Sequence, residues 1–244
     1  MQIGQSAATP LCYPSLKNGL RKTKRHPILA SILLAKKVIM QIQKTATLAA
    51  DKYTESILVV PTSTLFPHGA WNGLKKVDCD SYLYLIEKNK EFIARGVAET
   101  DPSYKQIIPY LVFTHNNHYF IMQRKASSTE QRLANKYSLG IGGHLREEDM
   151  EGSSIIEWAQ REFHEEISYT GSVSITPLGL LNDDSNEVGK VHAGFVFLLE
   201  GDSDQISIKS ELQHGYLATL DECKVKRPLM ETWSQYVLDY LTKS

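Results

Sequence analysis

The sequence has few cysteines and no long apolar run. Its three cysteines, Cys12, Cys79 and Cys223, are far apart and odd in number. They suggest neither a disulfide framework nor a metal-ligand cluster, which favours a reducing compartment and predicts a cytoplasmic protein. The apolar stretch over residues 28–35 is far too short to cross a bilayer, so no membrane span is expected.

The first 50 residues lack acidic side chains altogether. They contain eight Lys or Arg and no Asp or Glu, whereas residues 51–244 carry the other 19 basic residues and all 28 acidic ones, a balance of −9. An acidic folded region argues against a broad nucleic-acid surface, so no nucleic-acid partner is expected. A targeting peptide is one interpretation of residues 1–39, but no small-residue cleavage site follows. A basic, disordered extension is favoured, or a translation start misassigned upstream of Met40.

The remaining patterns predict strands interspersed with helices, in an order that favours an α/β or α+β layered domain. Strand patterns cover 56–60, 107–115, 118–124, 172–181 and 191–200, with Asn116-Asn117 as a hairpin turn. Helices are predicted from about residue 80 to Gly96, over 154–166, and from Pro228 to about Leu241. Loops are predicted over 62–74, 126–136 and 182–187.

The predicted helix at 154–166 carries an unusual acidic cluster. Glu162, Glu165 and Glu166 stand at i, i+3 and i+4, so their carboxylates share one helix face. Such like-charge pairs cost roughly 0.2–0.5 kcal/mol each in an isolated helix. A solvated acidic face is the ordinary explanation. The packed apolar stripe beside it and the Gly142-Gly143 turn upstream, where backbone can approach a phosphate, favour a metal and phosphate site instead.

Arg161-Glu162-Phe163-x-Glu165-Glu166 resembles the core of the Nudix box, with Gly143 as the first glycine of that motif. The order of elements around it resembles the family's α/β/α sandwich with a mixed sheet. The resemblance implies a Nudix-like hydrolase domain over residues 105–244. Residues 40–104 would then be a strand, loop and helix region that acts as a cap or as a dimerisation element of a homodimer.

The flanking loop departs from the family's pattern. Ser153 occupies the position of the motif's first Glu, and a four-residue insertion separates it from Gly143. Ser168 replaces the later Gly, and Ile141 replaces the Pro that often precedes Gly-Gly. An Ile-Gly-Gly-His turn and a Val-His-x-Gly strand resemble a subgroup of predicted MutT-like phosphoesterases.

The resemblance also implies roles for individual residues. Glu162, Glu165 and Glu166 would bind Mg²⁺, with Mn²⁺ as an alternative, and Arg161 would orient those carboxylates. The general base would be a box glutamate or a distant loop carboxylate, for which Glu187 is the best candidate and Asp183 and Asp184 are rivals. Four residues are candidates for binding substrate phosphate: Gly142, Gly143, His144 and Arg124.

Three functions are compatible with this pattern. The first is magnesium-dependent hydrolysis of a phosphoanhydride bond in a nucleoside diphosphate derivative or similar small molecule. The second is a non-catalytic ligand-binding or regulatory module, which the altered box keeps open. The third, isomerisation of an isoprenoid diphosphate, ranks last because it needs a cysteine near the site, and no motif places Cys79 or Cys223 there.

Two further interpretations concern aromatic and histidine side chains. Phe66, His68 and Trp71 in the 62–74 loop would suit recognition of a base by stacking. His192 shares a predicted strand face with Gly194 and Val196, which favours a core histidine.

Overall fold

The computed structural model describes residues 52–124, 135–150, 154–209 and 212–243. The predictions for residues 1–39, for most of the 126–136 loop and for Ser153 lie outside the described residues. All described residues belong to one compact unit, residues 49–244. Within them, no helix has the length and apolar character needed to cross a membrane.

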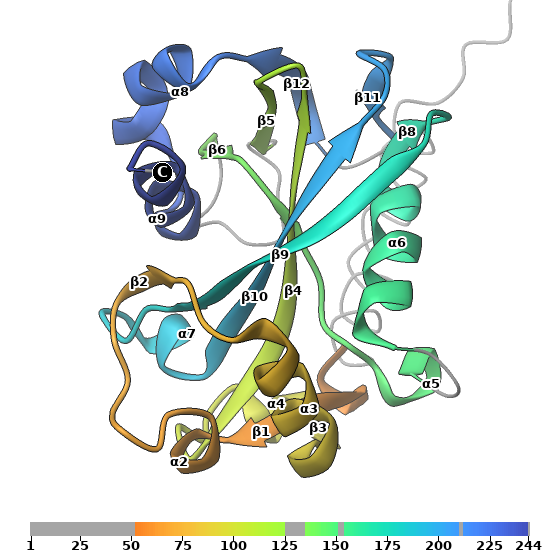
Figure 1. The fold of residues 1–244 in the computed structure, drawn as a ribbon. Coiled ribbons are helices and arrows are strands. Elements are labelled where there is room, and N and C mark those ends of the chain that lie inside the picture. Colours follow the sequence, from red (N-terminus) through yellow and green to blue (C-terminus); the bar gives the residue numbers. More distant parts are fainter. Residues whose placement is uncertain (1–51, 125–134, 151–153, 210–211, 244) are drawn as a thin grey trace, which may run out of the picture. The chain divides into compact units, whose positions relative to one another are not determined.

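One mixed sheet organises this unit (Figure 1). Its central order is β12-β5-β4-β10-β9-β2, and β4 and β10 run parallel while the neighbouring pairs are antiparallel. The strands of this sheet are β1 (Ser56–Pro61), β2 (Gly73–Lys75), β3 (Glu91–Ala94), β4 (Tyr104–His115), β5 (His118–Arg124), β6 (Tyr137–Ser138), β7 (Ile141–Gly142), β9 (Val173–Asn182), β10 (His192–Gly201) and β12 (Leu212–Ala218). A second, two-stranded sheet pairs β8 (Ile167–Tyr169) with β11 (Ile206–Ile208).

Helices lie on both sides of the sheet, which confirms the α/β sandwich (Figure 1). The helix α6 (Ile155–Glu166) lies on one side, and α8 (Leu220–Lys226) and α9 (Thr232–Leu241) lie on the other. The remaining helices are short or peripheral: α2 (Thr62–Leu65), α3 (Cys79–Asn89), α4 (Arg95–Ala98), α5 (Glu147–Met150), α7 (Glu187–Lys190) and a 3₁₀ turn (Arg227–Leu229).

Local sequence explains α6 well. Ser154 accepts from the Glu157 backbone N–H while the Glu157 carboxylate accepts from the Ser154 N–H, so a capping box begins the helix as predicted. Ile155, Trp158, Ala159 and Phe163 are buried, and the Phe163 ring stacks on Phe113 of β4 with centroids 5.7 Å apart. Truncating such a buried ring to Ala typically costs about 3–5 kcal/mol. Because these four apolar side chains face the core, the glutamates of α6 lie on the remaining part of the helix surface.

The predicted hairpin turn was right, and the bounds of two predicted helices were wrong. The hairpin turn is confirmed, since Asn116 and Asn117 have φ of 48° and 59°. The helix predicted from residue 80 to Gly96 ends at Asn89, because residues 91–94 pair with β1 as β3. The helix predicted from Pro228 is a 3₁₀ turn there, and α9 begins only at Thr232. In both cases tertiary contacts override local propensity.

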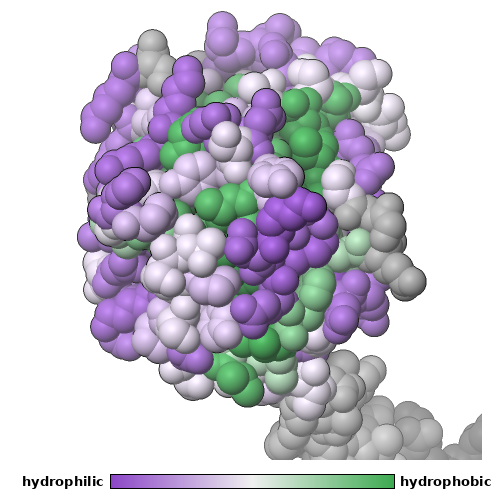
Figure 2. Space-filling view, turned by 60° about the horizontal axis from the view of Figure 1, so that its bottom comes forward, coloured by the Kyte–Doolittle hydropathy of each residue, from purple (hydrophilic) through white to green (hydrophobic). Residues whose placement is uncertain are grey.

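The N-terminal region shares the main sheet. β1 pairs with β4, and β2 pairs with β9. The 62–74 segment was predicted to be a loop, but it contains α2 and the start of β2. Seen from the end that carries α2, α3 and β3, the surface mixes hydrophilic and hydrophobic residues (Figure 2). Exposed apolar side chains on α3 and α4 include Tyr84 and Val97. The role of residues 40–104 as a cap or dimerisation element stays a prediction.

Candidate active site

The Gly142-Gly143 turn brings the backbone against a carboxylate of α6. Gly142 ends β7, which pairs with β4 opposite Tyr110. A Cβ on Gly143 would lie 2.5 Å from Glu162 Oε1 and 3.1 Å from the Trp158 ring. Because only glycine leaves room for this approach, the turn and the helix carboxylate form one site.

Burial differs among the three box glutamates. The Glu162 and Glu166 side chains are half-buried, and Glu165 is exposed. Burial, followed by the charges of Glu166 and Glu165, raises the pKa of the Glu162 carboxyl from 4.5 to about 7, and nearby Arg146 opposes this rise. The three carboxylates therefore repel one another at the edge of a cleft.

A first cleft of about 420 Å³ lies over this carboxylate. Its lining carries four basic and four acidic side chains together with the Gly142–His144 turn. The basic residues are Lys52, Arg95, Arg146 and Arg161, and the acidic residues are Glu55, Asp149, Glu162 and Glu165. Such a mixture can receive both an anionic phosphate and a cation.

Arg161 has a different partner from the one expected. Its Nη2 donates to the backbone oxygen of Asp149, 2.6 Å away, whereas the prediction had it orient the box carboxylates. Asp149 belongs to α5, within the lengthened loop, and its Oδ2 accepts from Arg146 Nε at 2.6 Å. Arg161 thus joins α6 to the inserted segment.

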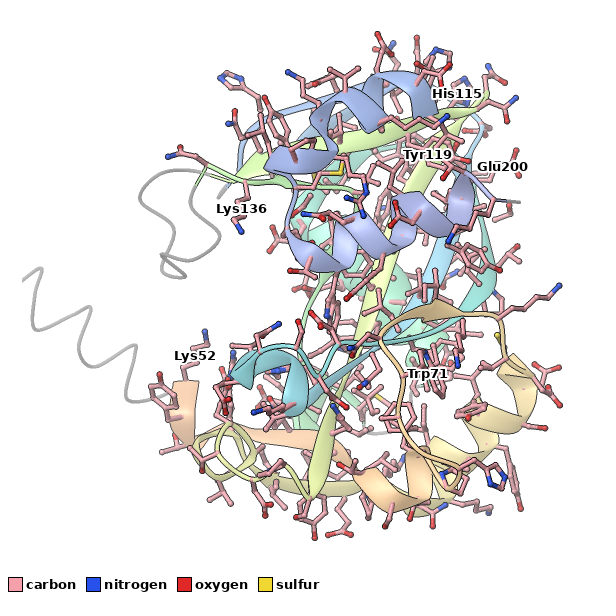
Figure 3. All side chains as sticks on the ribbon, turned by 90° about the vertical axis from the view of Figure 1, so that its left-hand side faces the viewer. Lys52, Trp71, His115, Tyr119, Lys136 and Glu200 are labelled. Carbon is pink, nitrogen blue, oxygen red and sulfur yellow. The ribbon has the colours of Figure 1, made fainter. Side chains whose placement is uncertain are left out.

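A second cleft of about 440 Å³ shares Gly142, Gly143 and His144 with the first. Its walls include Trp233 of α9 and Tyr110 of β4, whose rings meet edge to face at 5.7 Å. The two clefts therefore meet at the turn. In Figure 3, Lys52 of the first cleft and Lys136 of the second lie on the same side of the molecule.

The candidate loop carboxylates are placed unequally. Glu187 lies outside the lining of both clefts, and its largely exposed carboxylate pairs with Lys190 at 2.6 Å. Asp183 lines the second cleft but is buried, and it accepts from Ser185 Oγ at 2.6 Å. Asp184 pairs with the buried Lys105 at 2.7 Å. These contacts give the aspartates roles in holding the loop. Arg124 ends β5, and its side chain is outside the described residues.

Two other predictions concern residues away from the clefts. Phe66 is buried in the main core and meets Trp71 edge to face at 4.9 Å, and neither lines the two clefts. These two clefts therefore do not place Phe66 or Trp71 against a substrate, and base stacking by Phe66, His68 and Trp71 stays an untested expectation. Cys79 and Cys223 also lie outside both clefts, so among the described residues no thiol serves isomerase chemistry there.

His144 lies at the junction of the clefts among buried polar groups. Its Nε2 is 2.8 Å from Gln106 Oε1 and 3.3 Å from His192 Nε2. Burial, then the charge of Arg95, holds the pKa of His144 well below its usual value. In the part of the chain that the structure describes, one group of three side chains has ligand atoms all within 4.8 Å of one another, and it is Glu99, His144 and His192.

Sequence reasoning missed the residues that the N-terminal region contributes. Lys52, Glu55 and Arg95 line the first cleft, although they lie far before the box in the chain. No local motif marks them, because charged residues near strand and helix ends are usually solvated. These three residues line the same cleft as the box residues because β1 pairs with β4 in the main sheet.

Comparisons with known proteins identify the family. No family model matches the sequence. The chain is 36% identical over 205 residues to Protein YmaB of Bacillus subtilis (strain 168), covering 78% of this chain and 98% of that protein. The solved structure of Tm1382, described as a candidate Nudix hydrolase, is 31% identical with a TM-score of 0.66, covering 78% of this chain and 99% of Tm1382. The chain belongs to the Nudix family of hydrolases.

Proposed function

We propose that this protein is a metal-dependent pyrophosphohydrolase that cleaves a phosphoanhydride bond in a nucleoside diphosphate derivative or similar small molecule. The observation that carries the proposal is the placement of Glu162. Its carboxylate lies against the Gly143 backbone, beside two further glutamates, on the wall of a cleft that also holds basic side chains.

The donor set fits a hard divalent cation. Glu162, Glu165 and Glu166 would hold Mg²⁺ or Mn²⁺, because both ions prefer carboxylate oxygens together with substrate phosphates. The raised pKa of Glu162 reflects burial and carboxylate repulsion that a cation would relieve. When bound, such an ion neutralises phosphate charge and lowers the pKa of a coordinated water.

Residues around the glutamates would bind and orient the diphosphate. Lys52 and Arg146 line the first cleft and offer positive charge to phosphate oxygens. The Gly142-Gly143 turn lets the substrate approach the backbone closely. Arg161 acts indirectly. It donates to the Asp149 backbone oxygen and so holds α5, and the Asp149 carboxylate in turn holds Arg146.

The second cleft supports a substrate with an aromatic or sugar portion. It opens from the same turn, and Trp233 and Tyr110 supply apolar ring surface there. The Tyr110 hydroxyl donates to Glu231 Oε1 at 2.6 Å, which fixes that ring at the cleft wall. A nucleoside would therefore lie in the second cleft while its diphosphate reaches the first.

The general-base role suits Glu162 better than Glu187. Glu162 lines the first cleft and lies against the Gly143 turn, so its carboxylate is within the site. Glu187 is largely exposed and paired with Lys190, outside both clefts.

The test is hydrolysis of nucleotide sugars, dinucleoside polyphosphates and nucleoside triphosphates, with Mg²⁺, Mn²⁺ or a chelator, followed by chromatographic separation of the nucleotide products. Wild type is compared with Glu165→Gln and Glu166→Gln, and with Glu87→Gln as a control on an exposed helical glutamate of α3. We expect metal-dependent turnover in wild type and the control, and its loss in both box variants. Absence of turnover on every compound, with folded protein that still binds a ligand, would favour the non-catalytic module instead.

A further inference from the structure

We propose that Glu99, His144 and His192 form a transition-metal site, separate from the glutamates of α6. The three side chains come from different segments: Glu99 follows α4, His144 follows the Gly-Gly turn, and His192 begins β10. Their ligand atoms all lie within 4.8 Å of one another. The proposal does not rest on the proposed hydrolase activity, although His144 lines the same clefts.

Sheet pairing brings the histidines together. β10 runs parallel to β4 with His192 opposite Gln106, and β7 pairs with the same strand with Gly142 opposite Tyr110. The chain that leaves β7 therefore carries His144 back over the start of β10. The convergence is built into the sheet, so the two imidazoles are held by backbone pairing on both sides.

Hydrogen bonding fixes the tautomer of His192. Its Nδ1 lies 2.7 Å from the backbone oxygen of Val188. A carbonyl oxygen only accepts, so Nδ1 carries the proton and Nε2 of the neutral ring presents a lone pair. Imidazoles that bind metals are commonly oriented in this way, with the other ring nitrogen donating to a carbonyl.

The distance between the two imidazole nitrogens also fits a zinc site. Two nitrogens that bind zinc at about 2.0–2.1 Å with tetrahedral angles stand about 3.3–3.4 Å apart. His144 Nε2 and His192 Nε2 are 3.3 Å apart. A direct hydrogen bond between the rings would have a similar length, so the distance needs a second observation.

Gln106 supplies that observation. The residue is fully buried, its Oε1 accepts from His144 Nε2 at 2.8 Å, and its Nε2 has no hydrogen-bond partner among the residues that the structure describes. Without an ion, His144 Nε2 carries the proton of these contacts, so a metal that binds this nitrogen must displace that proton. The same arrangement leaves the buried NH2 group of Gln106 unsatisfied, which native proteins rarely tolerate. An ion with a coordinated water would give the amide a partner beside the two imidazoles.

The ligand chemistry selects the ion. Glu99 supplies a carboxylate, which Arg95 Nε holds at 3.2 Å, and the two histidines supply nitrogens. Two imidazoles and one carboxylate suit Zn²⁺ and its neighbours, whereas Mg²⁺ prefers oxygen ligands throughout. His144 lines both clefts, so the ion would lie where the clefts meet.

The experiment uses the full chain, stripped of metal, with Zn²⁺ as the titrant and Co²⁺ as a spectroscopic probe. We expect one Zn²⁺ per chain, a rise in melting temperature on binding, and a visible Co²⁺ spectrum of four- or five-coordinate character. His144→Gln and Glu99→Gln should each weaken Zn²⁺ binding at least tenfold. His214→Gln, an exposed histidine outside the cluster, should bind as wild type does.

The proposed Zn²⁺ site and the proposed Mg²⁺ site can be tested separately. Glu165→Gln and Glu166→Gln should keep the Zn²⁺ stoichiometry, and excess Mg²⁺ should not displace the ion. Equal Zn²⁺ affinity in wild type, His144→Gln and Glu99→Gln, with all three folded by circular dichroism, would overturn the proposal. So would a wild type that binds no Zn²⁺. Either result leaves the magnesium-dependent hydrolysis test unaffected.

Discussion

The Glu162 carboxylate lies so close to Gly143 that a Cβ at position 143 would stand 2.5 Å from Glu162 Oε1. Two segments of the box thus share one small volume, and any side chain on the turn must displace the carboxylate. This relationship makes the turn as important to the site as the helix.

Gly143→Ala should therefore lower kcat with little effect on melting temperature. The Glu162 side chain can move, so the fold survives, but a displacement of about 1 Å can cost roughly 100-fold in rate. Steady-state kinetics and thermal melts of the same preparation check this. In a double-mutant cycle with Glu162→Asp, the shorter carboxylate should make the two losses less than additive. Full additivity would show that the contact has no catalytic role.

Glu162→Gln should stabilise the metal-free protein above pH 7. The folded pKa is raised from 4.5 to about 7, so the folded state holds its proton more tightly than the unfolded state. The free energy of unfolding of wild type therefore falls as pH rises between these values, by up to about 3 kcal/mol. Urea unfolding with a chelator should show a more stable variant at pH 8 and little difference at pH 4. Glu87→Gln should show no such pH-dependent gain.

Arg161→Ala should loosen the inserted segment. The variant loses the hydrogen bond to the Asp149 oxygen, an exposed contact that we expect to contribute about 1 kcal/mol. Hydrogen exchange should speed up in α5 while the amides of α6 keep their protection. Arg161→Lys should retain part of this protection. Unchanged exchange in α5 would mean that other contacts hold the segment.

Trp233→Leu and Trp71→Leu should separate substrate recognition from packing. Trp233 lines the second cleft, so removing its ring should raise KM for the true substrate about tenfold with a smaller change in kcat. Trp71 donates from Nε1 to the Gly73 oxygen and packs on Phe66, so its replacement should lower the melting temperature and leave KM alone. Figure 3 shows Trp71 on the opposite side of the view from Lys52 and Lys136. A raised KM for Trp71→Leu with an unchanged KM for Trp233→Leu would show that the substrate does not bind in the second cleft.

Much of the fold could be predicted from local patterns. The α6 capping box and apolar stripe, the Asn116-Asn117 turn and the long strands follow rules that act over a few residues. Predictions failed where distant pairing decided the outcome, as in residues 91–94, which pair with β1 as a strand although they follow a helical pattern. A strand's partner is not encoded within the strand.

The sequence by itself determined the Nudix helix and its three glutamates, because helical periodicity places i, i+3 and i+4 on one face. Only the tertiary structure decided which residues join them. The pairing of β1 with β4 adds Lys52, Glu55 and Arg95 to the first cleft. The parallel pairing of β10 with β4 brings His192 beside His144. These contacts depend on the burial of whole strands, which no short stretch of sequence can specify.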